Sequence, residues 1–421
     1  MQKPDPKLTQ TDSTTGQKTA QSAHLPDAQA SPARETARRG NATILLSYGA
    51  FILIGANDGA LGVLLPSIRT HYQVNNATIG LFFLCSTVGY FIASFNNGLL
   101  IEKLGNRLFL MVGTTIFLLG VGILSLMPPF VVLLGAGLLL GMGGAMLDAG
   151  LNSYIAGLPR STAMLNYLHA FYGAGAWLGP VVASSLLALQ WGWNSVYLVW
   201  GGMSIVLLLG LGVFFGNGPH QEKLPAEGNV LATALRLRVV WLGALFLLFY
   251  VGSEVSLGSW SYSFLTEERH GALLLTGWVV SGYWLGLTVG RLALAKVAQR
   301  IGAQRLIELC LVGVVVGLLL VWLVPVEIVS AGALWLIGFS LGPIFPTTIA
   351  LMSKLVSARI LPSAIGFLAS LGSMGGALFP WLAGNLAQRV GLWSLLPFVI
   401  VLTIFMLGLW FALQKQPAIT T

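Results

Sequence analysis

The chain has 421 residues, of which 56% are hydrophobic and only 9% carry a charged side chain. Soluble domains carry roughly 25% charged residues, so this composition excludes a soluble protein of this length. The formal net charge is +8, and the two cysteines, Cys85 and Cys310, both lie in apolar stretches. We therefore expect both to be packing residues.

Apolar segments follow one another along most of the chain, each about 20 residues long, which is the length that crosses a ~30 Å hydrocarbon core as a helix. Twelve membrane spans are predicted, at 43–66, 77–101, 108–127, 131–156, 164–190, 194–215, 240–264, 274–297, 304–324, 327–354, 362–387 and 392–413. Strands of a membrane barrel would instead alternate over about ten residues. The sequence thus predicts an all-α membrane protein.

Polar stretches divide these segments into domains. Residues 1–42 are rich in Gln, Thr, Ala and Pro, which predicts a disordered N-terminal tail and not a signal peptide. Residues 216–239 form a polar stretch that predicts a linker. The linker would join two helical bundles at 43–215 and 240–414, and residues 415–421 would form a short C-terminal tail.

The basic residues are distributed unevenly over the two predicted sides of the membrane. With twelve spans, both termini share one side, which holds 19 of the 22 Lys and Arg residues. Only Arg69, Arg269 and Arg389 fall on the opposite side. By the positive-inside rule, both termini and the linker are expected in the cytoplasm, with the protein in the plasma membrane. This asymmetry makes the lipid bilayer, and not nucleic acid, the expected partner of the net charge. We expect a monomer.

The two halves of the sequence resemble one another at a nearly constant offset. Asp58, Leu61 and Gly62 match Glu254, Leu257 and Gly258 at an offset of 196 residues. Further glycine pairs continue the register at offsets of 197 and 200: Gly80 with Gly277, Gly89 with Gly286, and Gly175 with Gly375. Such a repeat predicts an internal duplication, and so two pseudosymmetric six-helix halves.

Two parallel six-helix halves describe the architecture of the major facilitator superfamily. The loop after the second span is similar to the signature loop of that superfamily. It contains Gly98, Glu102, Lys103, Gly105 and Arg107 at the spacing of the signature, with Glu102 in place of an Asp and Asn106 in place of one Arg. The resemblance implies that these five residues take part in conformational gating.

Spans 4 and 5 are similar to those of a narrower group, the fucose permease-like branch of sugar:proton symporters. Asp148 precedes Asn152 by four residues, and span 5 opens with Leu165-Asn166 and reaches His169. Ala-Asn57-Asp58 in span 1 also looks like that branch. The resemblance implies proton-coupled transport of a sugar-like solute. Asp148 stands where the fucose carrier has Glu, and His169 where it has a polar amide, so fucose itself does not follow.

Three carboxylates lie well inside the predicted spans: Asp58, Asp148 and Glu254. An ionised carboxylate at the bilayer centre costs about 2.5–3.5 kcal/mol even on the lenient insertion scale. Such a group prefers its protonated form when water is removed, and one beside a histidine could exchange protons near neutral pH. We therefore predict proton coupling through Asp148, His169, Asp58 and Glu254. The alternative is a structural role, with Asp148 paired to His169 or Asn152, or the other acids bonded to loosened helix turns.

Polar and aromatic side chains within the spans are the candidate solute ligands. The predicted set is Asn57, Asp58, Asn152, Asn166, Ser253, Glu254, Trp260, Tyr283 and Trp284. Membrane aromatics are often interface or packing residues, which is the alternative for each of them. Arg291 is expected to snorkel to the interface or to pair at a helix end.

The sequence carries no phosphate-binding loop, no dinucleotide fingerprint and no His/Cys cluster with metal spacing. We therefore expect no enzyme, no cofactor and no metal site, and predict a secondary transporter for a small polar solute, working as a proton symporter by alternating access. Two alternatives remain at this point. One is a proton-coupled antiporter that exports drugs or metabolites, and the other is a membrane sensor that keeps the fold without transporting.

Overall fold

The structure is a computed structural model, and it describes residues 32–158, 161–215, 230–357 and 359–416. The chain forms two units that divide after Arg38, and the description below concerns the second, which begins at Arg39. The helices are α1 (Pro32–Tyr72), α2 (Asn76–Ile79), α3 (Leu81–Ser125), α4 (Phe130–Ala156), α5 (Ser161–Ala188), α6 (Asn194–Phe214), α7 (Val230–Leu235), α8 (Arg238–Ser263), η1 (Phe264–Glu268), α9 (Leu273–Ile301), α10 (Ala303–Leu323), α11 (Glu327–Leu341), α12 (Ile344–Leu355), α13 (Leu361–Val390), η2 (Leu392–Ser394) and α14 (Leu395–Gln414).

Within the described ranges, eleven helical segments are long and apolar enough to cross a membrane. One of them, Asn76–Ser125, has 50 residues, which at 1.5 Å per residue is more than twice the thickness of a ~30 Å core. Gly105 interrupts it, with φ 74° and ψ 158°. Because these angles lie outside the helical region, Gly105 divides the segment into spans 2 and 3. The predicted twelve spans and the all-α membrane class are thereby confirmed.

Some element boundaries differ from those expected. Helix α1 begins at Pro32, ahead of the expected start at 43, and α7 lies inside the expected linker 216–239. Residues 1–31, 216–229 and 417–421, on which parts of the expected tails and linker fall, lie outside the described residues. The tenth span consists of two helices, α11 and α12, that meet at Gly342 and Pro343. Proline lacks the N–H that a continuous helix needs, so a break at this position is expected.

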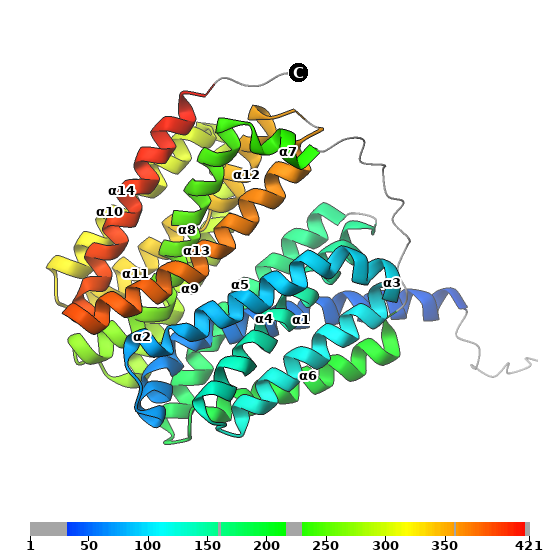
Figure 1. The fold of residues 1–421 in the computed structure, drawn as a ribbon, viewed down its shortest axis with the longest axis horizontal. Coiled ribbons are helices and arrows are strands. Elements are labelled where there is room, and N and C mark those ends of the chain that lie inside the picture. Colours follow the sequence, from blue (N-terminus) through cyan, green and yellow to red (C-terminus); the bar gives the residue numbers. More distant parts are fainter. Residues whose placement is uncertain (1–31, 159–160, 216–229, 358, 417–421) are drawn as a thin grey trace, which may run out of the picture. The chain divides into compact units, whose positions relative to one another are not determined.

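Figure 1 shows the two halves, α1–α6 and α8–α14, as separate groups of helices. The glycines of the sequence repeat make equivalent contacts in them. A Cβ atom on Gly175 of α5 would clash with the carbonyl oxygen of Ile52 of α1, and one on Gly375 of α13 would clash with that of Leu248 of α8. Helix α5 therefore crosses α1 as α13 crosses α8, at backbone contact that only glycine permits.

A second glycine pair repeats the same relationship between other helices. Gly89 of α3 faces the carbonyl oxygen of Leu138 in α4, and Gly286 of α9 faces that of Trp335 in α11. The two glycines and the two carbonyls are each 197 residues apart. The duplication predicted from the sequence is therefore present in the helix packing as well.

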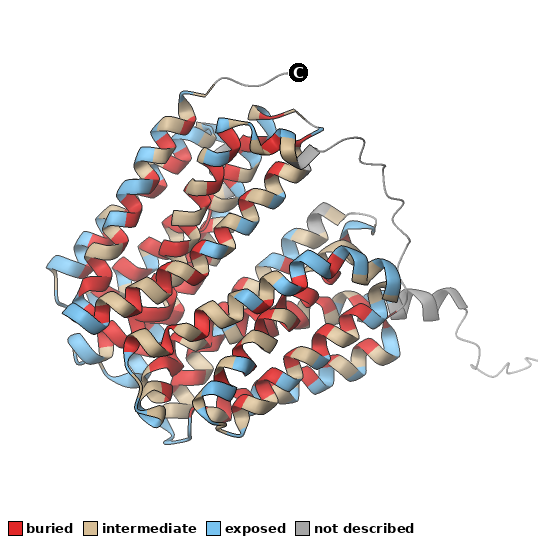
Figure 2. Cartoon of the chain, in the orientation of Figure 1, coloured by how far each residue is buried: buried red, intermediate tan, exposed pale blue. Residues whose placement is uncertain are grey.

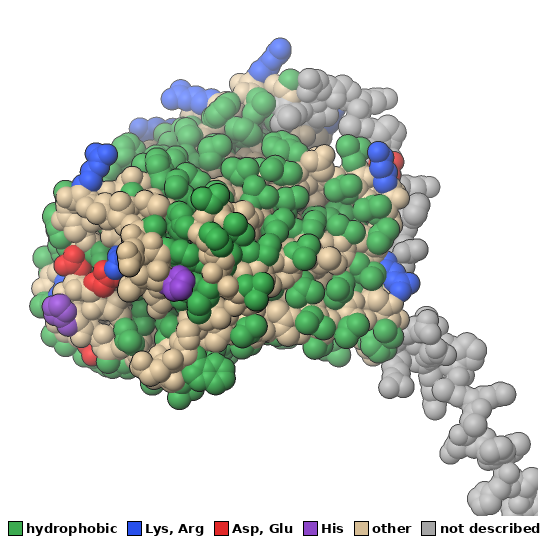
Figure 3. Space-filling model, turned by 60° about the horizontal axis from the view of Figure 1, so that its bottom comes forward, with side chains coloured by type: hydrophobic (Ala, Val, Ile, Leu, Met, Phe, Trp, Pro, Cys, Tyr) green, Lys and Arg blue, Asp and Glu red, His purple; other side chains and the backbone are tan. Residues whose placement is uncertain are grey.

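The surface of the helical unit is apolar. Large hydrophobic side chains such as Phe95, Val131 and Ile328 are 78–83% exposed, and Figure 2 shows buried residues gathered on the inward sides of the helices. Hydrophobic side chains also cover much of the face in Figure 3, with charged side chains mainly near its margins. A continuous apolar surface of this extent fits contact with lipid, where helices satisfy their own backbone hydrogen bonds.

Candidate functional site

A cavity of about 400 Å³ lies between the two halves, with walls from α1, α3, α4 and α5 on one side and from α8, α9 and α13 on the other. Its polar lining residues are Asn57, Asp58, Ser86, Thr87, Tyr90, Asp148, His169, Tyr172, Glu254, Ser259, Arg291 and Ser373. The three acids that the sequence singled out, Asp58, Asp148 and Glu254, are all among them. The structure thus brings together acids that lie up to 196 residues apart in the sequence.

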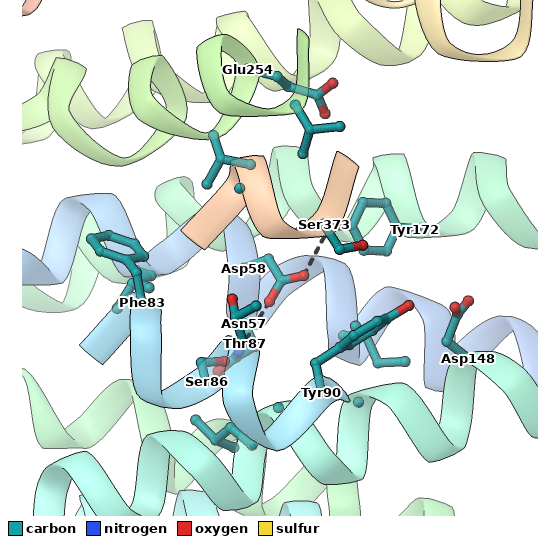
Figure 4. Close-up of a pocket in the computed structure, with 18 of the residues that line it drawn as sticks. Asn57, Asp58, Phe83, Ser86, Thr87, Tyr90, Asp148, Tyr172, Glu254 and Ser373 are labelled. Atoms are coloured by element: carbon teal, nitrogen blue, oxygen red, sulfur yellow. Dashed lines mark hydrogen bonds between the residues drawn. The ribbon is translucent and has the colours of Figure 1, made fainter. Parts of the chain in front are cut away.

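Asp58 lies on α1 and is exposed to the cavity. Its carboxylate accepts a hydrogen bond from the Tyr172 hydroxyl at 2.9 Å and one from the Asn57 side-chain amide at 3.3 Å (Figure 4). Tyr172 reaches Asp58 because α5 lies directly on α1, where Gly55 and Gly59 face the α5 backbone at Tyr172 and Ala176. Both donors are neutral, so the carboxylate is hydrogen-bonded but has no positively charged partner.

Asp148 lies on α4 and is partly buried. The Asn152 side-chain amide donates to its carboxylate at 2.8 Å and to its backbone carbonyl at 2.9 Å. The two residues are one turn apart, at the i,i+4 spacing that brings side chains together on a helix. The hydroxyl of Tyr90 on α3 also points toward Asp148 (Figure 4). Asp148 therefore has polar neighbours of the same neutral kind as Asp58.

Glu254 on α8 belongs to the second half and has a charged partner. The Arg291 guanidinium lies 3.5 Å from its carboxylate, with the side chains 29% and 12% exposed for Arg291 and Glu254. Arg291 also donates to the Gly342 carbonyl at 3.3 Å, and the Tyr283 hydroxyl donates to the Glu254 backbone carbonyl at 2.8 Å. Arg291 was expected to snorkel or pair at a helix end. It lines the cavity instead, because Glu254 supplies an opposite charge there.

His169 was expected beside Asp148, but the two side chains face different helices. His169 is exposed in the cavity wall and meets the ring of Phe51 on α1 edge-on, with ring centroids 5.5 Å apart. Asp148 faces Tyr90 of α3 and Asn152 of its own helix. The short connection between α4 and α5 brings the helices together without fixing their rotation about their own axes.

Several predicted ligands lie outside the cavity wall. Ser253 is fully buried and donates to the Phe249 carbonyl at 2.8 Å. The Trp260 indole donates to the Pro380 carbonyl at 2.9 Å, and Tyr283 is bonded to the backbone as described above. Asn152 and Asn166 are not among the lining residues either. Of the aromatic residues predicted to bind the solute, Trp284 is the one in the wall.

Sequence reasoning missed other members of the wall, notably Tyr90, Tyr172, Ser86, Ser259 and Ser373. Small hydroxyl residues and tyrosines are common in membrane helices, so their type alone gives no signal. Tyr172 could have been found, because it lies three residues after His169 and close to Gly175, a repeat glycine that marks where α5 meets α1.

The halves are joined on the side of the membrane where α1 ends, which we call the far side. The side where the bundle begins and α14 ends is the terminal side. At the far side, Arg69 pairs with Glu267 at 2.7 Å and also donates to the Asn76 side chain. The Asn76 backbone N–H donates to the Gln388 side chain at 3.0 Å. These four residues, which we call the far-side latch, link α1 and α2 to η1 and α13.

Backbone contacts between the halves lie near the latch. A Cβ atom on Gly62 of α1 would come within 2.5 Å of the Gly258 carbonyl oxygen of α8. The Ser281 hydroxyl of α9 donates to the Trp177 carbonyl of α5 at 2.6 Å. Such close approach leaves no room for a solute, so the far side of the cavity is closed in this structure.

The five residues expected to act in gating lie at the terminal side. Gly105 has the positive φ described above, and Gly302, its counterpart between α9 and α10, has φ 86° and ψ 152°. Arg107 donates to the Gly212 carbonyl at the end of α6, and Glu102 and Lys103 are exposed. A Cβ on Gly98 would meet nothing within 4 Å, so Gly98 makes no close helix contact in this far-side-closed state.

A membrane-spanning bundle of two related halves, with a polar cavity between them that is closed on one side, defines the class of membrane carriers. The Major Facilitator Superfamily matches this sequence over residues 48–276 and 247–420. The chain therefore belongs to that superfamily. The superfamily predicted from the loop motif and the repeat is confirmed, and so is the expectation of a transporter and not an enzyme.

Three relatives illustrate the similarity. The chain is 24% identical over 351 residues to a glucose/galactose transporter of Brucella abortus, covering 78% of this chain and 84% of the relative. It is 23% identical to the glucose/mannose transporter GlcP of Bacillus subtilis, covering 86% and 90%. It is also 26% identical to Bypass of stop codon protein 6 of Saccharomyces cerevisiae, covering 81% and 76%. The relatives named for glucose and galactose agree with the resemblance to the fucose permease-like branch.

Solved structures show the same fold at low identity. A bacterial homolog of the human lysosomal transporter Spinster superposes with a TM-score of 0.77 at 12% identity, covering 90% of this chain and 97% of that one. A D-xylose-proton symporter superposes with a TM-score of 0.74, also at 12% identity, covering 90% and 98%. The arrangement of the twelve spans is therefore that of this superfamily.

Proposed function

We propose that the protein is a proton-coupled symporter that carries a neutral monosaccharide by alternating access. One observation carries this proposal: Asp58 and Asp148 face a cavity between the halves, and their described hydrogen-bond donors are neutral. Protonation is then the available way to neutralise these carboxylates when the cavity loses its water. The step that removes water would be the closure of the terminal side.

The choice of a monosaccharide follows from the size and lining of the cavity. Its volume of about 400 Å³ lies near the lower end of the usual range for small-molecule sites, about 300–1,000 Å³. The wall offers hydroxyl, amide and carboxylate groups, and Trp284 and Phe83 add apolar ring surface that suits the flat side of a sugar. The relatives named as glucose/galactose and glucose/mannose transporters support the same class of solute.

Proton coupling follows from the cost of charge in a closed cavity. An ionised carboxylate is expensive away from water unless it is paired. A protonated acid can instead donate to a solute oxygen, so proton and sugar would stabilise one another in the loaded carrier. The D-xylose-proton symporter among the structural neighbours has this activity by name. In this account Asp148 takes up and releases the coupling proton with the help of His169, while protonation of Asp58 mainly serves solute binding and Glu254 stays paired with Arg291.

The orientation and the conformational state are part of the proposal. The Lys and Arg bias would place the terminal side in the cytoplasm and the protein in the plasma membrane as a monomer. The two bundles, 43–215 and 240–414, would then rock about the cavity, with 216–239 as their linker. Because the far-side latch is closed, the structure would represent the inward-facing state. The loop with Glu102, Lys103 and Arg107 would close the terminal side in the opposite state.

The test is transport by the purified protein in lipid vesicles. Glucose, galactose and mannose are supplied with and without an imposed pH gradient, and counterflow is measured at zero gradient. The proposal predicts uphill accumulation of at least one hexose that follows the gradient and collapses with a protonophore. Accumulation that is insensitive to the pH gradient would contradict the proposal. So would the absence of any hexose flux in vesicles where a control carrier is active.

A further inference from the structure

The charges that face the cavity are unbalanced. Three carboxylates line the cavity. Among the described lining residues, the positively charged side chain is Arg291, and His169 can become charged by protonation. Arg291 is already paired with Glu254 at 3.5 Å. Asp58 and Asp148 are therefore left to neutral partners, and an ionised cavity carries an excess of negative charge.

The surroundings of the two acids come from several helices. Asp58 accepts a hydrogen bond from Tyr172 of α5, and it also interacts electrostatically with Tyr90 of α3 and Asp148 of α4. The Glu254–Arg291 pair lies in the opposite wall and is neutral as a pair. His169 also faces the cavity, and its protonation at low pH would add positive charge.

We propose that the cavity also accepts a solute with one protonated amine, an amino sugar being the simplest, and that its ammonium group replaces the coupling proton at Asp58 or Asp148. The inference rests on the proposed function, because it uses the same cavity and the same two carboxylates. A neutral sugar would need a proton on the carrier to balance the charge. An amino sugar would bring its own positive charge.

The chemistry of the site fits such a group. A carboxylate has about four lone-pair positions, and Asp58 uses two of them for Tyr172 and Asn57. The remaining positions can accept from an ammonium group, in a charge-assisted hydrogen bond that is stronger than a neutral one. An amine occupies about the volume of a hydroxyl, so the sugar ring would keep its place. An anionic sugar would instead meet uncompensated negative charge.

A second observation concerns Trp284 in the opposite wall of the same cavity. Trp284 lines the wall and is 5% exposed, and its indole N–H has no hydrogen-bond partner among the described residues. A buried N–H without a partner is costly, so such groups are expected to receive an acceptor. Because the nitrogen is itself covered in this structure, a ring or hydroxyl oxygen of a sugar would supply one once the indole turns toward the cavity, while the amine at the other end of the molecule meets Asp58 or Asp148 in the first half.

The test compares matched ligands in binding to the purified protein at pH 5.5 and pH 7.0, where an amine is still mostly protonated. Each hexose is measured beside its 2-amino-2-deoxy form and its 2-deoxy form. The 2-deoxy sugar is the control, because it lacks the same hydroxyl but has no charge. The dissociation constant of the amino sugar should fall by about three- to thirtyfold from pH 5.5 to 7.0, since exchange of one proton allows at most tenfold per pH unit. The 2-deoxy sugar should show no such gain.

Transport gives an independent readout. Uptake of the neutral hexose should carry a proton into the vesicle and one positive charge with it. Uptake of the amino sugar should carry the same charge without the proton, as measured with a pH dye and a voltage dye together. In the Asp58→Asn or the Asp148→Asn variant, whichever residue holds the ammonium, amino-sugar binding should lose its pH dependence. Loss of the pH dependence in His169→Gln, together with its persistence in both aspartate variants, would assign it to the histidine and overturn the inference.

The outcomes separate the two proposals. If hexoses bind but the amino sugar binds no better than the 2-deoxy sugar at pH 7.0, the inference is overturned and the proposed function stands. If no neutral hexose binds, the proposed function fails, and pH-dependent binding of an amino sugar would still support the inference. A hexuronic acid that binds as well as the amino sugar at pH 7.0 would also overturn it.

Discussion

Gly62 of α1 lies against the backbone of Gly258 of α8, its counterpart 196 residues later in the repeat. The first helices of the two halves therefore cross at equivalent positions, on the pseudosymmetry axis. Arg69 and Glu267, which pair at the far side, are similarly related, 198 residues apart. The contact that closes the far side is thus formed by one repeated element meeting its own copy.

A side chain at Gly62 should prevent this closure. We expect Gly62→Val to shift the protein away from the far-side-closed state, because its Cβ would meet the Gly258 carbonyl oxygen at 2.5 Å and the backbone of Ser259 at 2.9 Å. Transport should fall at least about tenfold, the effect of about 1.4 kcal/mol on the conformational equilibrium. The reporter is Ser373→Cys in the cavity wall, without the native cysteines, labelled by an impermeant maleimide from the far side.

The control for that variant is Gly49→Ala on the same helix, where a Cβ would meet nothing within 4 Å. It should label and transport as the parent does. Equal far-side labelling of Ser373→Cys in the Gly62→Val and Gly49→Ala proteins would show that the α1–α8 contact does not control access.

The Arg69–Glu267 ion pair should contribute to the same equilibrium. Its side chains are 21% and 33% exposed. We therefore expect a modest effect of about 0.2–1 kcal/mol, as for other exposed ion pairs. Arg69→Glu alone should raise far-side labelling of Ser373→Cys about two- to fivefold. The charge swap Arg69→Glu with Glu267→Arg should return far-side labelling of Ser373→Cys most of the way to the parent level. No rescue by the swap would mean that Arg69 acts through Asn76 and not through Glu267.

The Glu254–Arg291 pair should matter for stability as a pair. Arg291→Gln should destabilise the protein by about 1–3 kcal/mol, less than the loss of a fully buried pair, because it leaves Glu254, 12% exposed, without its counter-charge. The double variant Glu254→Gln with Arg291→Gln should recover most of that loss. Thermal unfolding in detergent measures both. A double variant as unstable as Arg291→Gln would indicate that Arg291 acts mainly through its bond to Gly342.

The fold was largely predictable because its signals are local. Apolar segments give the spans, and the glycine pairs Gly175/Gly375 and Gly89/Gly286 mark helix crossings where a Cβ cannot fit. The site was only partly predictable. The cost of charge in a membrane singled out Asp58, Asp148 and Glu254, and the structure places all three in the cavity wall. Their partners depend on how each helix is rotated about its axis, which the spacing of residues does not determine.

Arg291 and His169 illustrate this limit: one gained a partner that was not expected, and the other lacks the partner that was. Arg291 looked like an interface residue from its position in span 8, yet Glu254 of a different helix holds it in the cavity. His169 looked like the partner of Asp148 because a short loop joins their helices, yet it packs on Phe51. The far-side latch lies beyond such reasoning altogether, since Asn76 and Gln388 meet across 312 residues of sequence.

Coupling at Asp148 is the centre of the account. The equivalent position of the second half is Pro346, so the packing of the repeat does not require an acid there. Asp148→Asn keeps the shape of the side chain and can still meet Asn152, but it cannot take up a proton. Asp58→Asn and Glu254→Gln are expected to weaken solute binding or opening more than coupling.

The decisive measurement is hexose flux in vesicles that contain Asp148→Asn, recorded as uptake under an imposed pH gradient and as counterflow without one. The account predicts that gradient-driven accumulation disappears while counterflow continues, because exchange need not release the proton. Accumulation against the hexose gradient by Asp148→Asn would contradict the account and transfer the coupling role to Asp58 or Glu254.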